Sequence, residues 1–169
     1  ALKKGAHIIN DINGGSEELF KLTKKYNAGL FLMHKRGTPK DMQKKLNPRA
    51  NMVKEFDEFI EKRLKILKKM KFNFKKVWFD PGIGFGKTLN QNLQLMRSLS
   101  KYSHKNLQIL LGSSRKSWIN FIDPSNADQR IGGSLASITH ALQQNVNTFR
   151  IHDVQETNQM IKVLKALNK

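Results

Sequence analysis

The stretch "FDPGIGFGKT", Phe79 to Thr88, decides the fold of this 169-residue chain. It follows the apolar residues Val77 and Trp78, and Pro81 both stops a strand and favours an extended conformation at the residue before it. The glycines that follow permit a tight turn. The stretch therefore predicts a strand over Val77–Asp80 with a carboxylate at its carboxyl end.

The glycines also suggest a phosphate-binding loop, but their spacing argues against both standard patterns. A P-loop needs four residues between its first glycine and Gly-Lys-Thr, whereas only three separate Gly82 from Gly86. A dinucleotide-binding loop needs a third glycine where Lys87 stands. Such loops aim successive N–H groups at phosphate, so a shift of one residue matters. Lys87 stays open as a phosphate or rim contact, or as a solvated charge.

Short apolar runs alternate with segments of helical periodicity along the chain. The predicted strands are bounded by glycine, proline or asparagine and cover His7–Ile12, Gly29–His34, Val77–Asp80, Gln108–Gly112 and Thr148–Ile151. Apolar residues at steps of three and four predict helices through Val53–Leu67, Ile131–Leu142 and Met160–Leu167. Strands that alternate with helices pair in parallel through crossover connections, so the class is α/β.

Chain length and polar residues favour a barrel, although the pattern alone also permits a doubly wound sheet. Five strand–helix units occupy 169 residues, so eight would need roughly 270, near the ~250 typical of a (β/α)8 TIM barrel. A barrel distributes polar strand ends around its carboxyl rim, whereas an open sheet concentrates them at one switch point. Nearly every strand here ends in such a cluster: Asn10-Asp11, His34–Arg36, Asp80, Ser113–Lys116 and Arg150–Asp153.

The composition is that of a globular domain with excess positive charge. The hydrophobic share is 38%, and no apolar run approaches the roughly 18 residues of a membrane span. The absence of cysteine fits a cytoplasmic protein without disulfides. The net charge of +18 permits a nucleic-acid-binding module, but the lysines are spread out rather than clustered. An anionic small-molecule substrate is therefore favoured over nucleic acid or a membrane.

Asp80 is the first candidate for chemistry, because a carboxylate at a barrel mouth lies partly out of water. An unpaired carboxylate there is costly, so Asp80 needs a partner. A helix N-cap or a salt bridge to a neighbouring lysine would satisfy it. A ligand with two adjacent N–H groups, as on a guanidine-like heterocycle, would do so too.

The stretch "LGSSRKS", Leu111 to Ser117, leaves a strand through a glycine and predicts a helix that starts with serines. Serines and free N–H groups at a helix start favour an anion. Arg115 and Lys116 add positive charge. An ordinary capped helix with solvated basic residues is the alternative.

The stretch "FRIHDV", Phe149 to Val154, alternates apolar and polar residues, so Arg150 and His152 share one face toward the barrel mouth. Arginine donates a planar fork suited to phosphate. The end of the last strand is also where barrel enzymes often hold phosphate. An ion pair of Arg150 with Asp153 is the structural alternative. No histidine spacing resembles a zinc site.

Five motifs together resemble the dihydropteroate synthase family of pterin-binding barrels. In the family's order they are "GAHIINDI", "LMH" followed by "GTP", "FDPGIGFGK", "LGSSRKS" and "RIHDV". The resemblance spans the whole chain, and "DPGIGFGK" and "SRKS" are its most specific parts. It implies the last five β/α units of a barrel, with residues 1–169 as the C-terminal part of a single pterin-binding domain.

The resemblance implies a transferase that joins 6-hydroxymethyl-7,8-dihydropterin pyrophosphate to 4-aminobenzoate, giving 7,8-dihydropteroate and pyrophosphate in folate biosynthesis. The family's reaction is described as dissociative, so pyrophosphate departs before the amine attacks. By this resemblance the catalytic residues are Asp80, Lys116, Arg150 and His152, and the last two also bind the pyrophosphate. The implied pterin-binding residues are Asn10, Ile12, Met33, Asp80, Phe85, Gly112, Lys116 and Arg150. Lys116 and Ser117 are implied to bind the aminobenzoate.

The family also has parts that this sequence does not contain. Its first three strands carry a contact to magnesium and pyrophosphate, so the resemblance implies Mg²⁺ as a cofactor with no metal ligand in this segment. The chain opens on "ALKKGAHIIND", which resembles the last turn of a helix before a strand. We expect a homodimer and a longer protein whose N-terminal barrel segment this chain needs.

Two other functions stay open. Another pterin-binding barrel, such as a methyltetrahydrofolate methyltransferase, would also use Asn10 and Asp80. It has no need of an Arg-His clamp for diphosphate, so "RIHDV" and "SRKS" argue against it. A non-catalytic basic binding module is suggested only by the charge.

Overall fold

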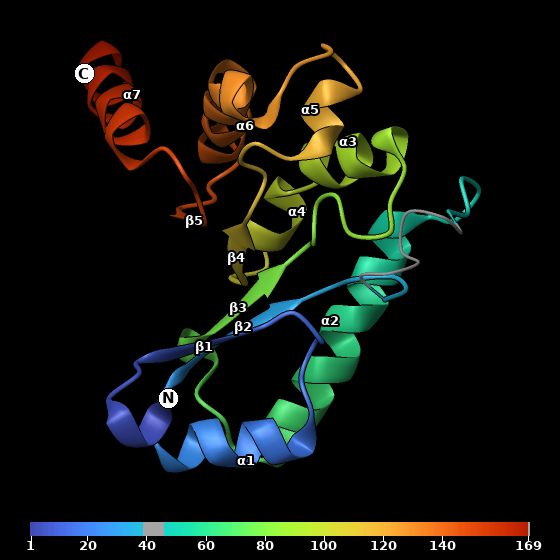
Figure 1. The fold of residues 1–169 in the computed structure, drawn as a ribbon. Helices are drawn as coiled ribbons and strands as arrows, with labels where there is room; N and C mark the ends of the chain where they lie inside the picture. Colours follow the sequence, from blue (N-terminus) through green and yellow to red (C-terminus); the bar gives the residue numbers. More distant parts are fainter. Residues whose placement is uncertain (39–45, 169) are drawn as a thin grey trace.

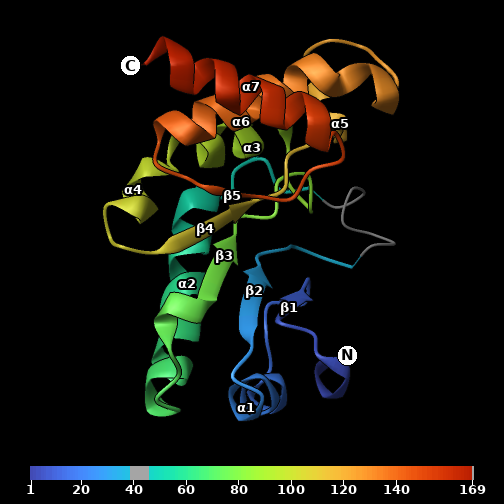
Figure 2. The same ribbon diagram turned by 90° about the vertical axis from the view of Figure 1, so that its left-hand side faces the viewer.

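The computed structural model describes residues 1–38 and 46–168, and its five strands form one curved sheet (Figure 1, Figure 2). Each strand pairs in parallel with the next one in the sequence. The strands are β1 (Ile8–Asp11), β2 (Gly29–Met33), β3 (Val77–Asp80), β4 (Gln108–Leu111) and β5 (Thr148–Phe149). All five predicted strands are confirmed, with ends that differ by at most two residues. Pro39 of the "GTP" motif lies outside the described residues.

The strand order decides between the two architectures that the sequence permitted. The order β1-β2-β3-β4-β5 never reverses, whereas a doubly wound sheet reverses at its switch point. A sheet of consecutive parallel strands that curls on itself is part of a (β/α)8 barrel. Among the described residues, β1 and β5 each have a neighbouring strand on one side only. The predicted barrel architecture is therefore confirmed, as a half-barrel.

Helices follow the strands along the outer side of the sheet (Figure 1). They are α1 (Glu17–Lys25), α2 (Met52–Lys69), α3 (Leu89–Arg97), α4 (Ser100–Ser103), α5 (Ser117–Asn120), α6 (Ile131–Gln143) and α7 (Val154–Leu167). Short 3-10 turns cover Leu2–Lys4, Phe74–Lys76 and Ala127–Arg130. The periodicity predicted α2, α6 and the second half of α7. In the described ranges 1–38 and 46–168, no helix is long and apolar enough for a bilayer crossing.

Polar side chains fix where the main helices begin. The Ser16 side chain accepts a hydrogen bond from Leu19 N at the start of α1. Thr88 and Gln91 form a reciprocal capping box at the start of α3. Each such cap stabilises its helix by roughly 0.5–2 kcal/mol. The last residue of "FDPGIGFGKT" is thus a helix cap, which ends the turn behind β3.

The two faces of the sheet differ in how they are covered. The register aligns Leu32 with Phe79 and Phe79 with Ile109, and this outer row is at most 3% exposed beneath the helices. The inner row aligns Phe31 with Trp78, and both side chains stay partly exposed. Their rings pack edge to face, with 5.2 Å between the ring centres. The main core therefore lies between the sheet and the helices, and the inner face is open.

Candidate active site

Three polar side chains, from β1, from β3 and from the residue after β5, meet on the inner face of the sheet. Arg150 Nη1 donates to Asn10 Oδ1 and Arg150 Nη2 donates to Asp80 Oδ2, both at 3.1 Å. Asp80 is 1% exposed, whereas the Arg150 side chain is 39% exposed. The predicted alternatives for Asp80, a helix N-cap or a lysine salt bridge, are both wrong. Its carboxylate pairs with an arginine 70 residues away in sequence.

The second oxygen of Asp80 is held by the turn that follows it. Gly82 N donates to Asp80 Oδ1 at 2.7 Å. Burial raises the pKa of Asp80, while Lys116, the Gly82 N–H and Arg150 act in the opposite direction. Gly82 has φ +64°, and a Cβ atom there would collide with His34 O, so this position requires glycine.

Lys116 crosses the mouth of the half-barrel toward the same turn. Its Nζ atom donates to Ile83 O at 2.7 Å and lies 4.5 Å from the centre of the Phe85 ring. Burial lowers the pKa of Lys116 to about 8, although nearby Asp80 raises it. The structure thus brings Lys116, Phe85 and Asp80 together, as the sequence predicted.

Arg150 lies directly against the main chain at the end of β4. A Cβ atom on Gly112 would stand 2.7 Å from Arg150 Nη2, so a side chain here would require the guanidinium to shift. Gly112 therefore leaves the space in which the guanidinium reaches Asp80. Met33 aligns with Asp80 in the β2–β3 register and is 1% exposed. It forms part of the floor beside the carboxylate.

The "SSRKS" and "RIHDV" stretches are tied to each other. Ser114 Oγ accepts from His152 N at 3.4 Å and lies 3.1 Å from His152 Nδ1. The Arg115 guanidinium donates two hydrogen bonds to the Asp153 carboxylate, one from Nε at 3.0 Å and one from Nη2. The predicted alternative, an Arg150–Asp153 ion pair, is wrong because Asp153 pairs with Arg115 and leaves Arg150 for Asp80.

The serines of "LGSSRKS" do not cap the following helix. Helix α5 begins at Ser117 and its N-cap residue, Lys116, makes no side-chain cap bond. Ser113 Oγ instead lies 2.7 Å from Ser137 Oγ. The prediction of a serine-capped helix start is therefore wrong, and these hydroxyls link segments of the rim. Ser117 and Ile12, both predicted site residues, are exposed at the rim.

Sequence reasoning misplaced Lys87. It is 3% exposed, and its Nζ atom donates to His34 O, Gly82 O and Phe85 O at 3.2, 2.9 and 3.0 Å. It is therefore neither a rim contact nor a solvated charge. The partners are main-chain carbonyls brought together by the fold, so no pattern in the sequence indicates them.

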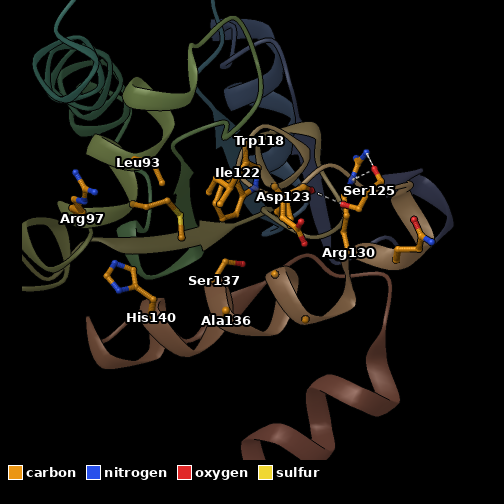
Figure 3. Close-up of a pocket in the computed structure, with 15 residues that line it drawn as sticks. Leu93, Arg97, Trp118, Ile122, Asp123, Ser125, Arg130, Ala136, Ser137 and His140 are labelled. Carbon is orange, nitrogen blue, oxygen red and sulfur yellow. Dashed lines mark hydrogen bonds between the residues drawn. The ribbon is translucent and has the colours of Figure 1, made fainter.

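An apolar cavity of about 500 Å³ lies on the outer side, among α3, α5 and α6 (Figure 3). Figure 3 shows Leu93 and Arg97 of α3 opposite Ala136, Ser137 and His140 of α6, with Trp118 and Ile122 to the side of Leu93. None of the predicted site residues lines it. The cavity is therefore separate from the predicted site residues.

Comparisons of the sequence and of the fold identify relatives of this chain. Dihydropteroate synthase of Escherichia coli is 36% identical over 166 residues, which cover 97% of this chain and 58% of that protein. Dihydropteroate synthase of Thermus thermophilus, solved in complex with 6HMPPP, is 31% identical with a TM-score of 0.89 and covers 99% of this chain. Its 4-aminobenzoate complex has the same identity and TM-score.

The chain covers 67% and 69% of the two Thermus thermophilus chains. It therefore spans less than two thirds of the curated Escherichia coli relative and about two thirds of these solved ones. The model of the family described as "Pterin binding enzyme" matches residues 1–152, which include every strand and every predicted site residue. The chain belongs to the family of pterin binding enzymes.

Proposed function

We propose that the protein containing this chain is a dihydropteroate synthase, which joins 6-hydroxymethyl-7,8-dihydropterin pyrophosphate to 4-aminobenzoate and releases pyrophosphate. The names of the relatives and the two Thermus thermophilus complexes support this reaction. The observation that carries the proposal is that the Arg150 guanidinium donates hydrogen bonds to the side chains of Asn10 and Asp80.

A guanidinium and the amino-pyrimidinone edge of a pterin need the same kind of hydrogen-bond acceptors. Each presents adjacent, coplanar N–H groups to carboxylate and amide oxygens. Asn10 Oδ1 and Asp80 Oδ2 already accept two such groups from Arg150. We propose that the pterin edge takes these acceptors when it binds and that Arg150 turns to stack on the open ring face. Ile12, Met33, Phe85 and Gly112 would line the slot.

The proposed chemistry follows from the charges around the slot. The C–O bond between the pterin methylene and the pyrophosphate breaks, and its electron pair leaves with the pyrophosphate. The amine nitrogen of 4-aminobenzoate then forms a C–N bond to the methylene cation and loses a proton. Asp80 favours the positive charge that develops on the ring, whereas Arg150 and His152 stabilise the departing anion. Lys116 would contact the pterin, and Lys116 and Ser117 would bind the aminobenzoate carboxylate.

Magnesium remains part of the proposal as a cofactor. Among the described residues no group of three or more histidine, cysteine or acidic side chains is placed to hold a metal ion, although Mg²⁺ often takes only one or two protein ligands beside substrate phosphates. Following the resemblance, the proposal assigns the protein contact of Mg²⁺ to a segment outside this chain, and no step above depends on it. We also propose a cytoplasmic location, supported by the absence of cysteine.

Further strands are proposed to complete the barrel. On the inner face Ile8 is 42% exposed in β1, which has an open edge among the described strands. Exposed edges and apolar faces favour association, so another segment of the protein is proposed to cover them. Homodimerisation is proposed through exposed apolar side chains near the helices, because Phe121 and Ile122 directly after α5 and Leu167 at the end of α7 are 58–76% exposed. Sedimentation of the native protein at two concentrations tests the dimer.

Pyrophosphate release from the pterin substrate, with and without 4-aminobenzoate, tests the proposed function on the native protein. We expect turnover that requires 4-aminobenzoate and yields dihydropteroate. A methyltransferase would instead accept methyltetrahydrofolate and release no pyrophosphate. A basic binding module would show salt-dependent binding of plain duplex DNA and no tight binding of the pterin diphosphate. Either result would reject the proposal.

A further inference from the structure

Lys87 carries a charge in the interior, behind the proposed pterin slot. Its side chain is 3% exposed, and an isolated ammonium in such a place would be costly. An ammonium has three N–H donors, and here Nζ lies 2.9–3.2 Å from three carbonyl oxygens. Every donor therefore has an acceptor, which offsets much of the cost of burial.

These three carbonyls belong to two segments that are distant in sequence. His34 follows β2, whereas Gly82 and Phe85 begin and end the turn behind β3. The segments pack main chain against main chain, because a Cβ atom on Gly82 would collide with His34 O. Phe85 N also donates to Gly82 O at 3.0 Å, which closes the turn. The ammonium joins both ends of this turn to the end of β2.

The same turn supplies several contacts of the candidate site. Its Gly82 N–H holds Asp80 Oδ1 at 2.7 Å, and its Ile83 carbonyl holds Lys116 Nζ at 2.7 Å. The Phe85 ring lies 4.5 Å from the same ammonium of Lys116. A change in the shape of the turn would therefore move the carboxylate, the lysine and the ring together.

We propose that Lys87 is a positioning residue for pterin binding, which holds the Gly82–Phe85 turn against the end of β2 and so fixes Asp80, Lys116 and Phe85. The inference rests on the proposed function for the identity of the ligand. Lys87 itself does not contact the substrate in this account. It acts through three main-chain carbonyls, which fix the backbone of the turn whatever side chains the turn carries.

The charged groups around Lys87 are consistent with this role. Burial lowers the pKa of Lys87 to about 7, Asp80 and Glu55 raise it, and Lys116 and Arg36 lower it. Hydrogen bonds to three carbonyl oxygens favour the protonated form, because a neutral amine has only two donors. The ammonium form is thus stabilised by three main-chain carbonyls, because none of the described carboxylates lies at salt-bridge distance from Lys87.

The test compares Lys87→Met with Lys62→Met, in which an exposed lysine of α2 is changed in the same way. Affinity for 6-hydroxymethyl-7,8-dihydropterin pyrophosphate and hydrogen exchange at Phe85 N–H are measured on the native protein. We expect pterin binding to weaken at least about tenfold in Lys87→Met, as when one bond to a charged group is lost. Phe85 N–H exchange should accelerate, and the KM for 4-aminobenzoate should rise as well, because the turn also holds Lys116 through Ile83 O. Lys62→Met should match the wild type in all three.

Unchanged pterin affinity or unchanged Phe85 exchange in folded Lys87→Met protein would overturn the inference. If this variant does not fold, Lys87→Arg replaces it, because its planar guanidinium cannot repeat the three bonds of an ammonium. Wild-type affinity in Lys87→Arg would then overturn the inference. A protein that binds the pterin but releases no pyrophosphate would reject only the proposed function. The exchange measurement needs no ligand, so it tests the turn in either case.

Discussion

Phe79 and Asp80 are neighbours on β3, yet they serve opposite faces of the half-barrel. Phe79 is 1% exposed within the apolar layer between the sheet and the helices. Asp80 is equally buried but accepts hydrogen bonds from Arg150 and from Gly82 N. The outer face is covered by the chain's own helices, so it supports stability. The inner face concentrates charged groups beside an open surface, so it is suited to a ligand.

Phe79→Ala tests the outer face and should have the largest effect on stability. Loss of a buried phenyl ring removes its transfer free energy and leaves a cavity, which costs about 3–5 kcal/mol. Urea denaturation measures the free energy of unfolding. Phe74→Ala, at a site that is 43% exposed, is the matched control and should cost less than about 1 kcal/mol. Equal losses in the two variants would contradict the assignment of the core to this face.

Arg150→Ala tests the inner face through ligand binding. Each charge-assisted bond lost to the diphosphate should cost about 1.5–3 kcal/mol. Affinities for the pterin with and without the diphosphate are measured by calorimetry, with the exposed Arg49→Ala as control. The diphosphate form should lose much more affinity than the plain pterin. Equal affinity of the variant for both pterins would support the role, whereas an undiminished preference for the diphosphate form would argue against it.

His34→Leu tests the pH dependence of stability at a buried residue that follows β2, at the boundary between the two faces. Burial lowers the pKa of His34 to about 3, helped by Lys87, Arg36 and Arg63. Between about pH 6.5 and 3 the unfolded chain therefore binds more protons than the native one, so stability falls on acidification. The loss approaches ~1.4 kcal/mol per pH unit within that window. Unfolding at pH 7 and pH 5 should show a flatter dependence in His34→Leu, and an unchanged slope would show that other groups cause it.

The strands were predictable because each is a short apolar run bounded by glycine, proline or asparagine. Helices α1 and α3 were missed, since their buried positions include polar residues that interrupt the apolar period. Thr23 is buried in α1, and Gln91 and Asn92 are buried in α3. These side chains bond main-chain groups: Gln91 Nε2, for example, donates to Ala50 O at 3.0 Å. Such partners come from tertiary packing and leave no local signal.

For the candidate site too, the sequence indicated the functional groups but not the partners that the fold gives them. Alternation along "FRIHDV" correctly placed Arg150 toward the barrel mouth, but it could not choose between Asp153 and Asp80 as its partner. Asp153 is three residues away in sequence, whereas Asp80 is 70 residues away and closer in space to the guanidinium. Residue types therefore indicated which groups carry the chemistry. The fold alone decides which of them meet.

The turnover number and free energy of unfolding of Asp80→Asn test the central claim most directly, that the inner face serves chemistry rather than stability. Asparagine keeps the shape of the side chain and removes its charge. Turnover in the pyrophosphate-release assay should fall on the order of 10²–10³-fold, as for other lost electrostatic contacts to a transition state. The free energy of unfolding should change much less than in Phe79→Ala. A raised KM with unchanged kcat, or a stability loss equal to that of Phe79→Ala, would contradict the account.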